Sequence, residues 1–112
     1  MDAWELADVE AARVAAGARY HEFLSVPDLS AGLYVLDAGA TDEQSPHTED
    51  ELYYVIEGRA QVRVGDDERA IEQGSLVFVA AHVDHKFHDI EERLVLLVFF
   101  GPAEYSRRTA AG

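Results

Sequence analysis

From residue 20 to residue 100 the chain consists of short runs of valine, leucine, tyrosine and phenylalanine, separated by turn residues every eight to twelve positions. This spacing is typical of an all-β sandwich or barrel. Glu57-Gly58 predicts one of the turns. The expected strands are residues 20–24, 32–37, 52–56, 60–64, 69–72, 76–79, 85–88 and 93–100.

Residues 3–16 predict an α-helix ahead of these strands. The segment is rich in alanine, Asp2 is placed to cap its free amides, and Gly17 is placed to end it. Its apolar side chains recur at helical spacing, which favours a helix. These side chains are Trp4, Ala7, Ala11 and Val14.

The last expected strand is apolar on both faces, because every residue from Leu94 to Phe100 is apolar. Such a strand must be covered on both sides. One face can line a barrel interior, and the other needs the N-terminal helix or a second subunit, so we expect a homodimer. The expected organisation is a helix at residues 1–17, a barrel domain at residues 18–103 and a polar tail at residues 104–112.

Charge and composition narrow the function. The 112 residues include 22 acidic and 9 basic side chains, and the net charge of −13 repels nucleic acid and anionic lipid. The absence of cysteine removes disulfides, thiolate metal sites and a cysteine nucleophile. The sequence has no basic leader and no apolar run near the ~20 residues of a membrane helix. We therefore expect a cytoplasmic protein whose partners are small molecules rather than nucleic acid or membrane.

One set of side chains has the spacing of a metal site. His47 and Glu51 are four residues apart, so on a strand both project from one face. His85 begins another expected strand, and it shares its face with the apolar Phe87. Two imidazoles and one carboxylate on one side of a cation leave positions open for substrate or oxygen, as in non-haem Fe(II) enzymes. The alternative is that these residues are surface groups or structural hydrogen-bonding groups.

At these positions the chain resembles the cupin superfamily, specifically its small single-domain β-barrel members, over about residues 39–89. The first cupin motif corresponds to Gly39, Ser45-Pro46-His47, Glu51 and Gly58. The second corresponds to Gly74, Ala80, His82, His85 and Asp89, of which only the glycine and His85 match. The family's usual metal centre has three histidines and a glutamate, and here Ser45 stands in place of the first histidine.

The resemblance implies an antiparallel double-stranded β-helix, that is, a jelly-roll barrel, with the N-terminal helix outside it. It also implies a divalent metal ion bound by His47, Glu51 and His85, with Fe(II) favoured over Mn(II), Ni(II) or Zn(II). The expected function is dioxygenase-type oxidation of a small organic molecule. Two alternatives stay open: a cupin that binds a sugar or other metabolite without catalysis, and a metal-free isomerase or epimerase with His47 or His85 as general base.

Further residues near the expected site have two interpretations each. Tyr53, Phe78, His82 and Phe87 are candidates for substrate binding, although barrel core for the aromatic residues and an exposed turn for His82 are the ordinary interpretations. Glu49 could replace the missing histidine ligand, whereas the usual interpretation of the surrounding acidic segment is a solvated loop. His88 is expected on the outer surface or at an interface.

Overall fold

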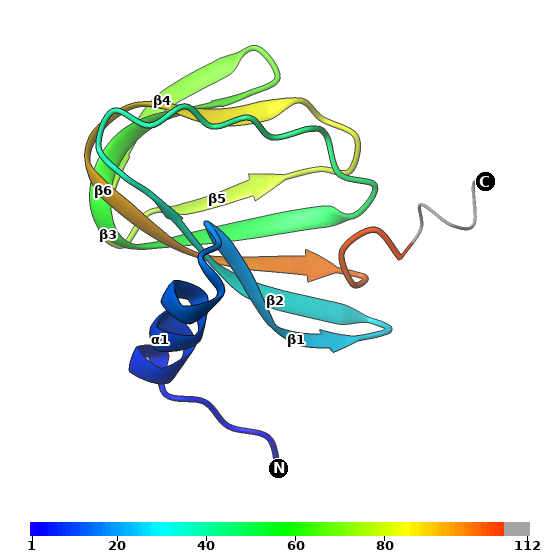
Figure 1. The fold of residues 1–112 in the computed structure, drawn as a ribbon. Coiled ribbons are helices and arrows are strands. Elements are labelled where there is room, and N and C mark those ends of the chain that lie inside the picture. Colours follow the sequence, from blue (N-terminus) through cyan, green and yellow to red (C-terminus); the bar gives the residue numbers. More distant parts are fainter. Residues whose placement is uncertain (107–112) are drawn as a thin grey trace.

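A computed structural model describes residues 1–106 of the chain (Figure 1). One helix and six strands make up this part of the chain, and the strands curve into a barrel with the helix outside it. The elements are α1 (Leu6–Ala16), β1 (Tyr20–Val26), β2 (Leu29–Leu36), β3 (Asp50–Val64), β4 (Asp67–Glu72), β5 (Leu76–Val79) and β6 (His85–Gly101). The strand order is β1-β2-β6-β3-β4, β5 also pairs with β3, and every pairing is antiparallel.

Two strands are longer than expected. The expected strands at residues 52–56 and 60–64 form the single strand β3, and those at 85–88 and 93–100 form β6. Glu57-Gly58 is therefore not a turn but part of an irregular stretch where the register between β3 and β6 shifts. Gly58 has a φ of 99°, and a Cβ there would lie 2.2 Å from the carbonyl oxygen of Arg93. Glycine thus lets β3 bend around the barrel without ending.

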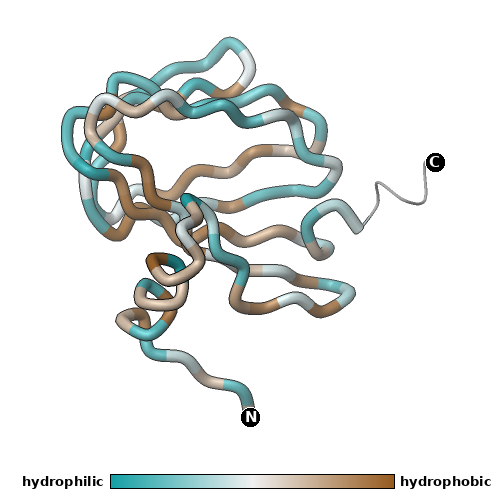
Figure 2. The backbone as a smooth tube through the Cα atoms, viewed as in Figure 1, coloured by the Kyte–Doolittle hydropathy of each residue, from teal (hydrophilic) through white to brown (hydrophobic). Residues whose placement is uncertain are grey.

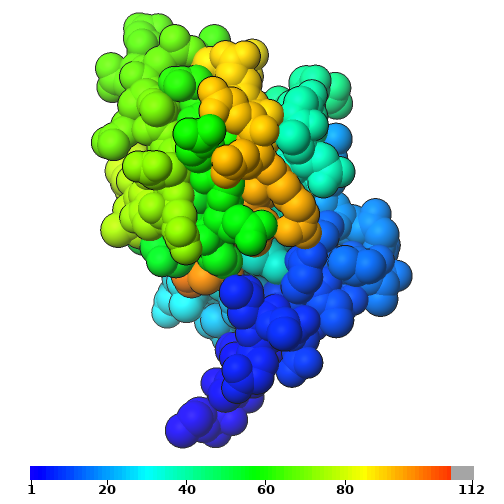
Figure 3. All heavy atoms as spheres, turned by 90° about the vertical axis from the view of Figure 1, so that its left-hand side faces the viewer, coloured from blue at the N-terminus to red at the C-terminus, as the bar shows by residue number. Residues whose placement is uncertain are grey.

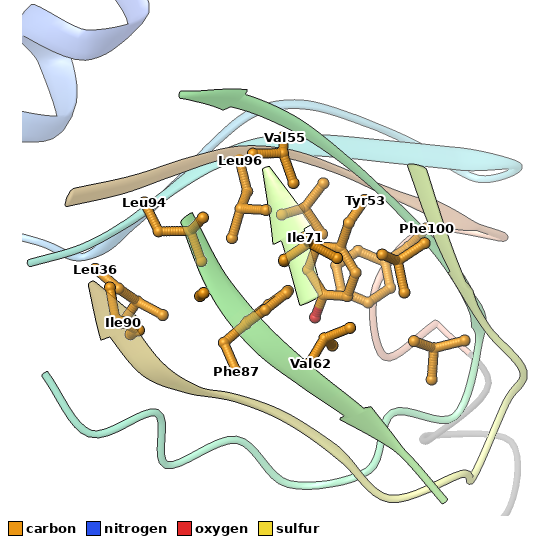
Figure 4. Packing of buried hydrophobic residues seen from close by; sticks show 14 residues of the cluster. Leu36, Tyr53, Val55, Val62, Ile71, Phe87, Ile90, Leu94, Leu96 and Phe100 are labelled. Carbon is orange, nitrogen blue, oxygen red and sulfur yellow. The ribbon is translucent and has the colours of Figure 1, made fainter. Parts of the chain in front are cut away.

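The barrel interior holds the main hydrophobic core (Figure 4). Tyr53 from β3 and Phe87 from β6 meet there edge to face, with ring centroids 4.9 Å apart. Alternate residues of β6 point inward, so Leu94, Leu96 and Val98 are buried in this core. Hydrophobic residues follow the strands around the barrel, while the connecting segments are more hydrophilic (Figure 2).

The helix differs from the expectation at its start. It begins at Leu6 rather than residue 3, and Glu5, not Asp2, is at its N-cap, without a side-chain capping bond. Gly17 ends it, as predicted. Val9 is the only buried residue of the helix. The helix packs on β1 and β2, and the N-terminal residues lie at one end of the molecule (Figure 3).

A second, smaller core lies under the helix on the outer face of the sheet. It consists of Val9, Leu33, Val35 and Val95. Beyond the helix, the same outer face presents exposed apolar side chains from β3 and β5. We call this set the outer apolar face: Leu52, Tyr54, Leu76 and Phe78. The expectation that Phe78 belongs to the barrel core is wrong, because Val77 and Val79 take the inward positions of β5 and Phe78 is 59% exposed.

No helix within residues 1–106 is long and apolar enough to cross a membrane.

Candidate metal centre

Three buried side chains converge at one end of the barrel interior: His47, Glu51 and His85. Glu51 is the second residue of β3 and His85 is the first residue of β6. His47 lies on the loop before β3, so it does not share a strand with Glu51, and the alternation of side chains along a strand is not what brings the two together. One potential ligand atom from each residue lies within 4.8 Å of the other two. The structure thus brings together the three residues that the sequence singled out, and they could bind a metal ion.

The atoms that face one another in this cluster are poorly satisfied by protein groups. Glu51 Oε1 lies 3.6 Å from His47 Nδ1 and 3.1 Å from His85 Nε2. Although both are fully buried, His47 Nδ1 and Glu51 Oε1 make no hydrogen bond to any described residue. Native proteins rarely leave buried polar atoms in this condition unless a water molecule or a bound ion satisfies them. The donor set therefore fits a divalent cation.

The surroundings of His85 lead to the same conclusion. Its Nδ1 lies 3.0 Å from the carbonyl oxygen of Val83, to which it donates, so the lone pair is on Nε2 in the neutral ring. That Nε2 faces Glu51 Oε1 at 3.1 Å and Gln44 Oε1 at 3.3 Å, both of which are acceptors. Three electron-rich atoms at this spacing require a proton or a metal ion between them.

The pKa of His85 depends on two opposing effects, burial of the ring and its electron-rich neighbours. Burial alone would lower the pKa of His85, but a protonated ring would gain the Glu51 carboxylate 3.1 Å from Nε2 in addition to the Val83 carbonyl, and these two groups with the charge of Asp42 raise the pKa above its ordinary value. In the metal-free protein the site thus favours a positive charge, which a proton on the His85 ring provides.

The segment before His47 is an ordered support for the site rather than the expected solvated loop. Asp42 is buried, and it accepts hydrogen bonds from the Tyr34 hydroxyl (2.6 Å), Gln44 Nε2 (2.7 Å) and the Phe87 backbone N–H (2.9 Å). Gln44 in turn accepts a hydrogen bond from the Tyr53 hydroxyl at 2.9 Å. Sequence reasoning missed Asp42, because nothing in its neighbourhood distinguishes it from the exposed Glu43.

Neither residue near the missing histidine position joins the cluster. Ser45 is exposed and lines the cavity above the cluster. Glu49 is buried, but its carboxylate accepts hydrogen bonds from the Thr48 hydroxyl and the Tyr105 backbone N–H. The idea that Glu49 replaces the histidine ligand is therefore wrong, because its side chain is directed to the C-terminal segment instead.

Residues of the expected polar tail line the site, a role that the sequence did not predict. Glu104 Oε2 lies 3.1 Å from His47 Nε2, and the Tyr105 ring stacks on the His47 ring with centroids 5.1 Å apart. The last part of the expected tail, residues 107–112, lies outside the described residues.

A cavity of about 270 Å³ opens directly onto His47 and Glu51. Tyr20, from β1, contributes a hydroxyl that is buried and has no hydrogen-bond partner among residues 1–106. Gly32 makes room for this phenol, since a Cβ at position 32 would lie 2.4 Å from it. The remaining lining residues are Tyr34, Glu43, Gln44, Ser45, Tyr53, Val98, Phe100, Glu104 and Tyr105.

The other candidate substrate residues lie in different environments. Tyr53 lines the cavity, whereas Phe87 packs behind it in the core. Phe78 is on the outer apolar face. His82 is an exposed turn residue with a φ of 68°, and its backbone N–H donates to the His47 carbonyl at 2.7 Å. It therefore supports the His47 loop through its backbone.

His88 lies between Glu68 and Asp89 on the outside of the barrel, at 2.9 Å from each carboxylate. It has no contact with the His47, Glu51 and His85 cluster in the described part of the chain.

Comparison with known proteins gives consistent matches. Residues 32–100 match the cupin domain family. An uncharacterized protein of Streptomyces coelicolor is 48% identical over 104 residues, which cover 93% of this chain and 99% of the relative. An RmlC-like cupin from Shewanella frigidimarina has a TM-score of 0.67 and 27% identity, with 75% of each chain covered. A double-stranded β-helix protein of the RmlC-like cupin family from Methanocaldococcus jannaschii has a TM-score of 0.71 and 15% identity, covering 83% of this chain and 84% of that one. The predicted barrel class is thereby confirmed.

Proposed function

The chain belongs to the cupin domain family, and on that premise we propose that it binds a divalent metal ion through His47, Glu51 and His85 and oxidises a small organic molecule in a dioxygenase-type reaction. The observation that carries the proposal is the buried cluster of three ligand atoms beside a cavity, two of which lack hydrogen-bond partners in the described chain. Fold similarity alone does not supply a function, so this cluster and not the barrel supports the proposal.

The ligand set suits a first-row metal with open coordination positions. Imidazole and carboxylate donors accept Fe(II), Mn(II), Ni(II) and Zn(II), and two histidines with one carboxylate are the set found in non-haem Fe(II) oxygenases. When bound, Fe(II) supplies the one-electron chemistry that allows an organic molecule to react with oxygen. Ser45, which lines the cavity in place of the family's first histidine, offers only a neutral hydroxyl, a weaker ligand than imidazole.

The cavity limits what the substrate can be. Its volume of about 270 Å³ is at the small end of ligand pockets. Val98 and Phe100 give it an apolar wall, and the Tyr20 hydroxyl is available to donate to a substrate oxygen. Burial and the nearby charge of Glu104 raise the pKa of Tyr20 far above its usual value, so it keeps its proton. Carboxylates of Glu51 and Glu104 disfavour anionic substrates, and a small neutral molecule fits best.

The test has two parts: nitric oxide, which binds Fe(II) in place of oxygen, reports on the metal site, and an oxygen electrode reports on turnover. Purified protein is loaded anaerobically with Fe(II) and exposed to nitric oxide, and we expect the electron paramagnetic resonance signal of a half-integer-spin iron–nitrosyl adduct. Oxygen uptake is then measured across small neutral diketones, catechols and hydroxy esters. We expect uptake with at least one class, abolished by a chelator and by His85→Ala but retained in His82→Ala.

The two alternative functions predict other outcomes. Activity that survives complete chelation, with a bell-shaped pH profile, would indicate the metal-free isomerase or epimerase in which a histidine is the general base. Ligand binding without turnover, unchanged in His47→Ala and His85→Ala, would indicate a non-catalytic binding protein. Either outcome overturns the metal-dependent oxidation.

The proposal includes a homodimer formed through the outer apolar face. In the sheet register, Phe78 lies opposite Leu52 and Leu52 lies opposite Phe99, while Leu76 and Tyr54 pair in the next row. This surface continues the core under the helix, since Leu97 packs against that core and is the β6 partner of Tyr54. The four side chains are uncharged in a chain of net charge −13. A two-fold axis here would bring two neutral patches together and keep the acidic surfaces apart.

The acidic surface and the lack of cysteine also support a cytoplasmic protein whose partners are small molecules rather than nucleic acid or membrane.

A further inference from the structure

The two histidines of the cluster are each contacted at the ring nitrogen that points away from Glu51. For His85 that contact is the Val83 carbonyl, 3.0 Å from Nδ1. For His47 it is the Glu104 carboxylate, 3.1 Å from Nε2. From this pairing we infer that Glu104, on the segment after the last strand, is a positioning residue: it accepts the Nε2 proton of His47 and so presents the Nδ1 lone pair to the metal.

The two nitrogens of an imidazole ring are coupled. In a neutral ring, one nitrogen carries the hydrogen and the other carries the lone pair. If one nitrogen donates a hydrogen bond, the other nitrogen therefore presents its lone pair. A carboxylate is a strong acceptor for the N–H, and metal-bound histidines usually have such a partner. His47 Nδ1 is the nitrogen that faces Glu51 Oε1 and has no hydrogen-bond partner in the described chain. With Glu104 on Nε2, the unsatisfied Nδ1 becomes the donor atom.

The backbone around Glu104 holds the carboxylate in place. The Ala103 N–H donates to the Pro27 carbonyl at 3.3 Å, and the Glu104 N–H donates to the hydroxyl of the fully buried Ser30 at 2.8 Å. The Tyr105 N–H donates to Glu49. Three successive backbone amides are thus hydrogen-bonded to three different parts of the barrel: the loop between β1 and β2, β2 itself, and the segment before β3. These bonds fix the backbone from which the Glu104 side chain projects.

Two aromatic rings also contact the ring of His47. The Phe100 ring is tilted against it with centroids 4.8 Å apart, and the Tyr105 ring stacks on it at 5.1 Å with an interplanar angle of 23°. These contacts restrict the ring plane, while Glu104 determines which nitrogen carries the proton. Two adjacent residues of the C-terminal segment therefore act on His47: Tyr105 restricts the plane of the ring, and Glu104 selects its tautomer.

This inference rests on the proposed metal site, but its first test does not require metal. Nitrogen-15 NMR of metal-free protein with labelled histidine distinguishes protonated from unprotonated ring nitrogens. At a pH where His47 is neutral, we expect His47 in the Nε2–H form in the wild type and in Glu104→Gln, whose amide oxygen can still accept the proton. In Glu104→Ala we expect a mixture of both tautomers. Glu91→Ala, which removes an exposed carboxylate outside the cavity, is the matched control and should behave as wild type.

The second readout is the affinity for Zn(II), measured by competition with a chromophoric chelator. Loss of a partner of this kind costs roughly 10–100-fold in metal affinity. We expect a loss of that size in Glu104→Ala, a smaller loss in Glu104→Gln and none in Glu91→Ala.

Two results would overturn the inference. Unchanged tautomers in Glu104→Ala would show that Glu104 does not position His47, and an accompanying loss of affinity would then identify it as a direct ligand. A wild-type His47 in the Nδ1–H form would exclude the mechanism at once. If the wild-type protein binds no metal while the tautomer responds to Glu104 as expected, the proposed function fails and the positioning role stands.

Discussion

His85 and Glu51 meet across the barrel interior even though the strand register places them far apart. In the pairing of β3 with β6, His85 lies opposite Val64 at one end of β3, whereas Glu51 lies opposite Phe100 near the other end. Nevertheless, His85 Nε2 is 3.1 Å from Glu51 Oε1. The curvature of the two long strands closes the barrel and makes the cluster, so the site and the fold depend on the same bend.

Replacing His85 should remove the metal without unfolding the protein. Untagged wild-type protein purified without chelator is expected to contain close to one equivalent of iron, manganese or nickel per chain, and His85→Ala only a small fraction of that. His82→Ala, the matched histidine that contributes only its backbone, should keep the wild-type content. Elemental analysis provides the measurement, and equal metal in wild type and His85→Ala would contradict the site.

Metal affinity should fall on acidification at an unusually high pH. The pKa of His85 is raised above 6.5 in the metal-free protein, and only the neutral ring can bind a metal ion. The apparent Kd for Zn(II) should therefore rise by about tenfold per pH unit once the pH falls below that raised pKa. Competition titrations over a pH series test this. A Kd that stays constant down to pH 6.5 would contradict a raised pKa.

The same shift has the opposite effect on the stability of the metal-free protein. Because the folded pKa of His85 exceeds the unfolded value, the folded state binds the proton more tightly. Its contribution to the free energy of unfolding should be complete below the unfolded pKa and disappear as the pH rises through the raised folded pKa. Urea unfolding with chelator present, compared between wild type and His85→Gln, isolates this contribution. A difference that grows with rising pH would reverse the sign and contradict the assignment.

Gly58→Ala should destabilise the barrel much more than Gly39→Ala. Both glycines have positive φ, but a Cβ at position 58 would lie 2.2 Å from the Arg93 carbonyl oxygen, whereas position 39 is open. We expect a loss of about 1 kcal/mol for Gly39→Ala and more than about 3 kcal/mol for Gly58→Ala. Urea midpoints provide the comparison, and similar shifts for the two variants would mean that β3 can bend without glycine.

Asp42, in the loop before β3, should contribute more to stability than Asp50, the first residue of β3. Asp42→Ala leaves the buried Phe87 N–H and the Tyr34 hydroxyl without their acceptor, which should cost about 3 kcal/mol. Asp50→Ala removes a single exposed bond to the Ala81 N–H and should cost about 1 kcal/mol. Thermal unfolding of both variants measures the difference. Equal losses would show that the loop is not organised around Asp42.

Phe78→Glu should convert the proposed homodimer to a monomer. The substitution places a charge in the outer apolar face of both copies, where like charges would face each other across a two-fold axis. Val14→Glu adds the same charge at an exposed apolar position of the helix and should leave the dimer intact. Light scattering after size-exclusion chromatography determines the mass, and a monomeric wild type would refute the dimer.

Several features of the site were predictable because they depend on local spacing. His47, Glu51 and His85 stand at motif positions relative to Gly39, Gly58 and Gly74, and they converge as expected. The conformation of the loop that carries His47 was not predictable in this way, because it depends on distant contacts. The Phe87 N–H and the Tyr34 hydroxyl hold Asp42, and the His82 N–H holds the His47 carbonyl.

The amino-acid sequence by itself determined the strand-rich barrel, the covered strand from Leu94 to Phe100 and the three candidate ligands, because side-chain periodicity and motif spacing are properties of neighbouring residues. Only the tertiary structure decided that Glu57-Gly58 continues a strand, that Val9 anchors the helix and that Phe78 faces outward. It also decided that Tyr20 opens into the cavity and that Glu104 reaches His47. Each of these depends on contacts between segments far apart in the chain, which only closure of the barrel brings within a few ångströms.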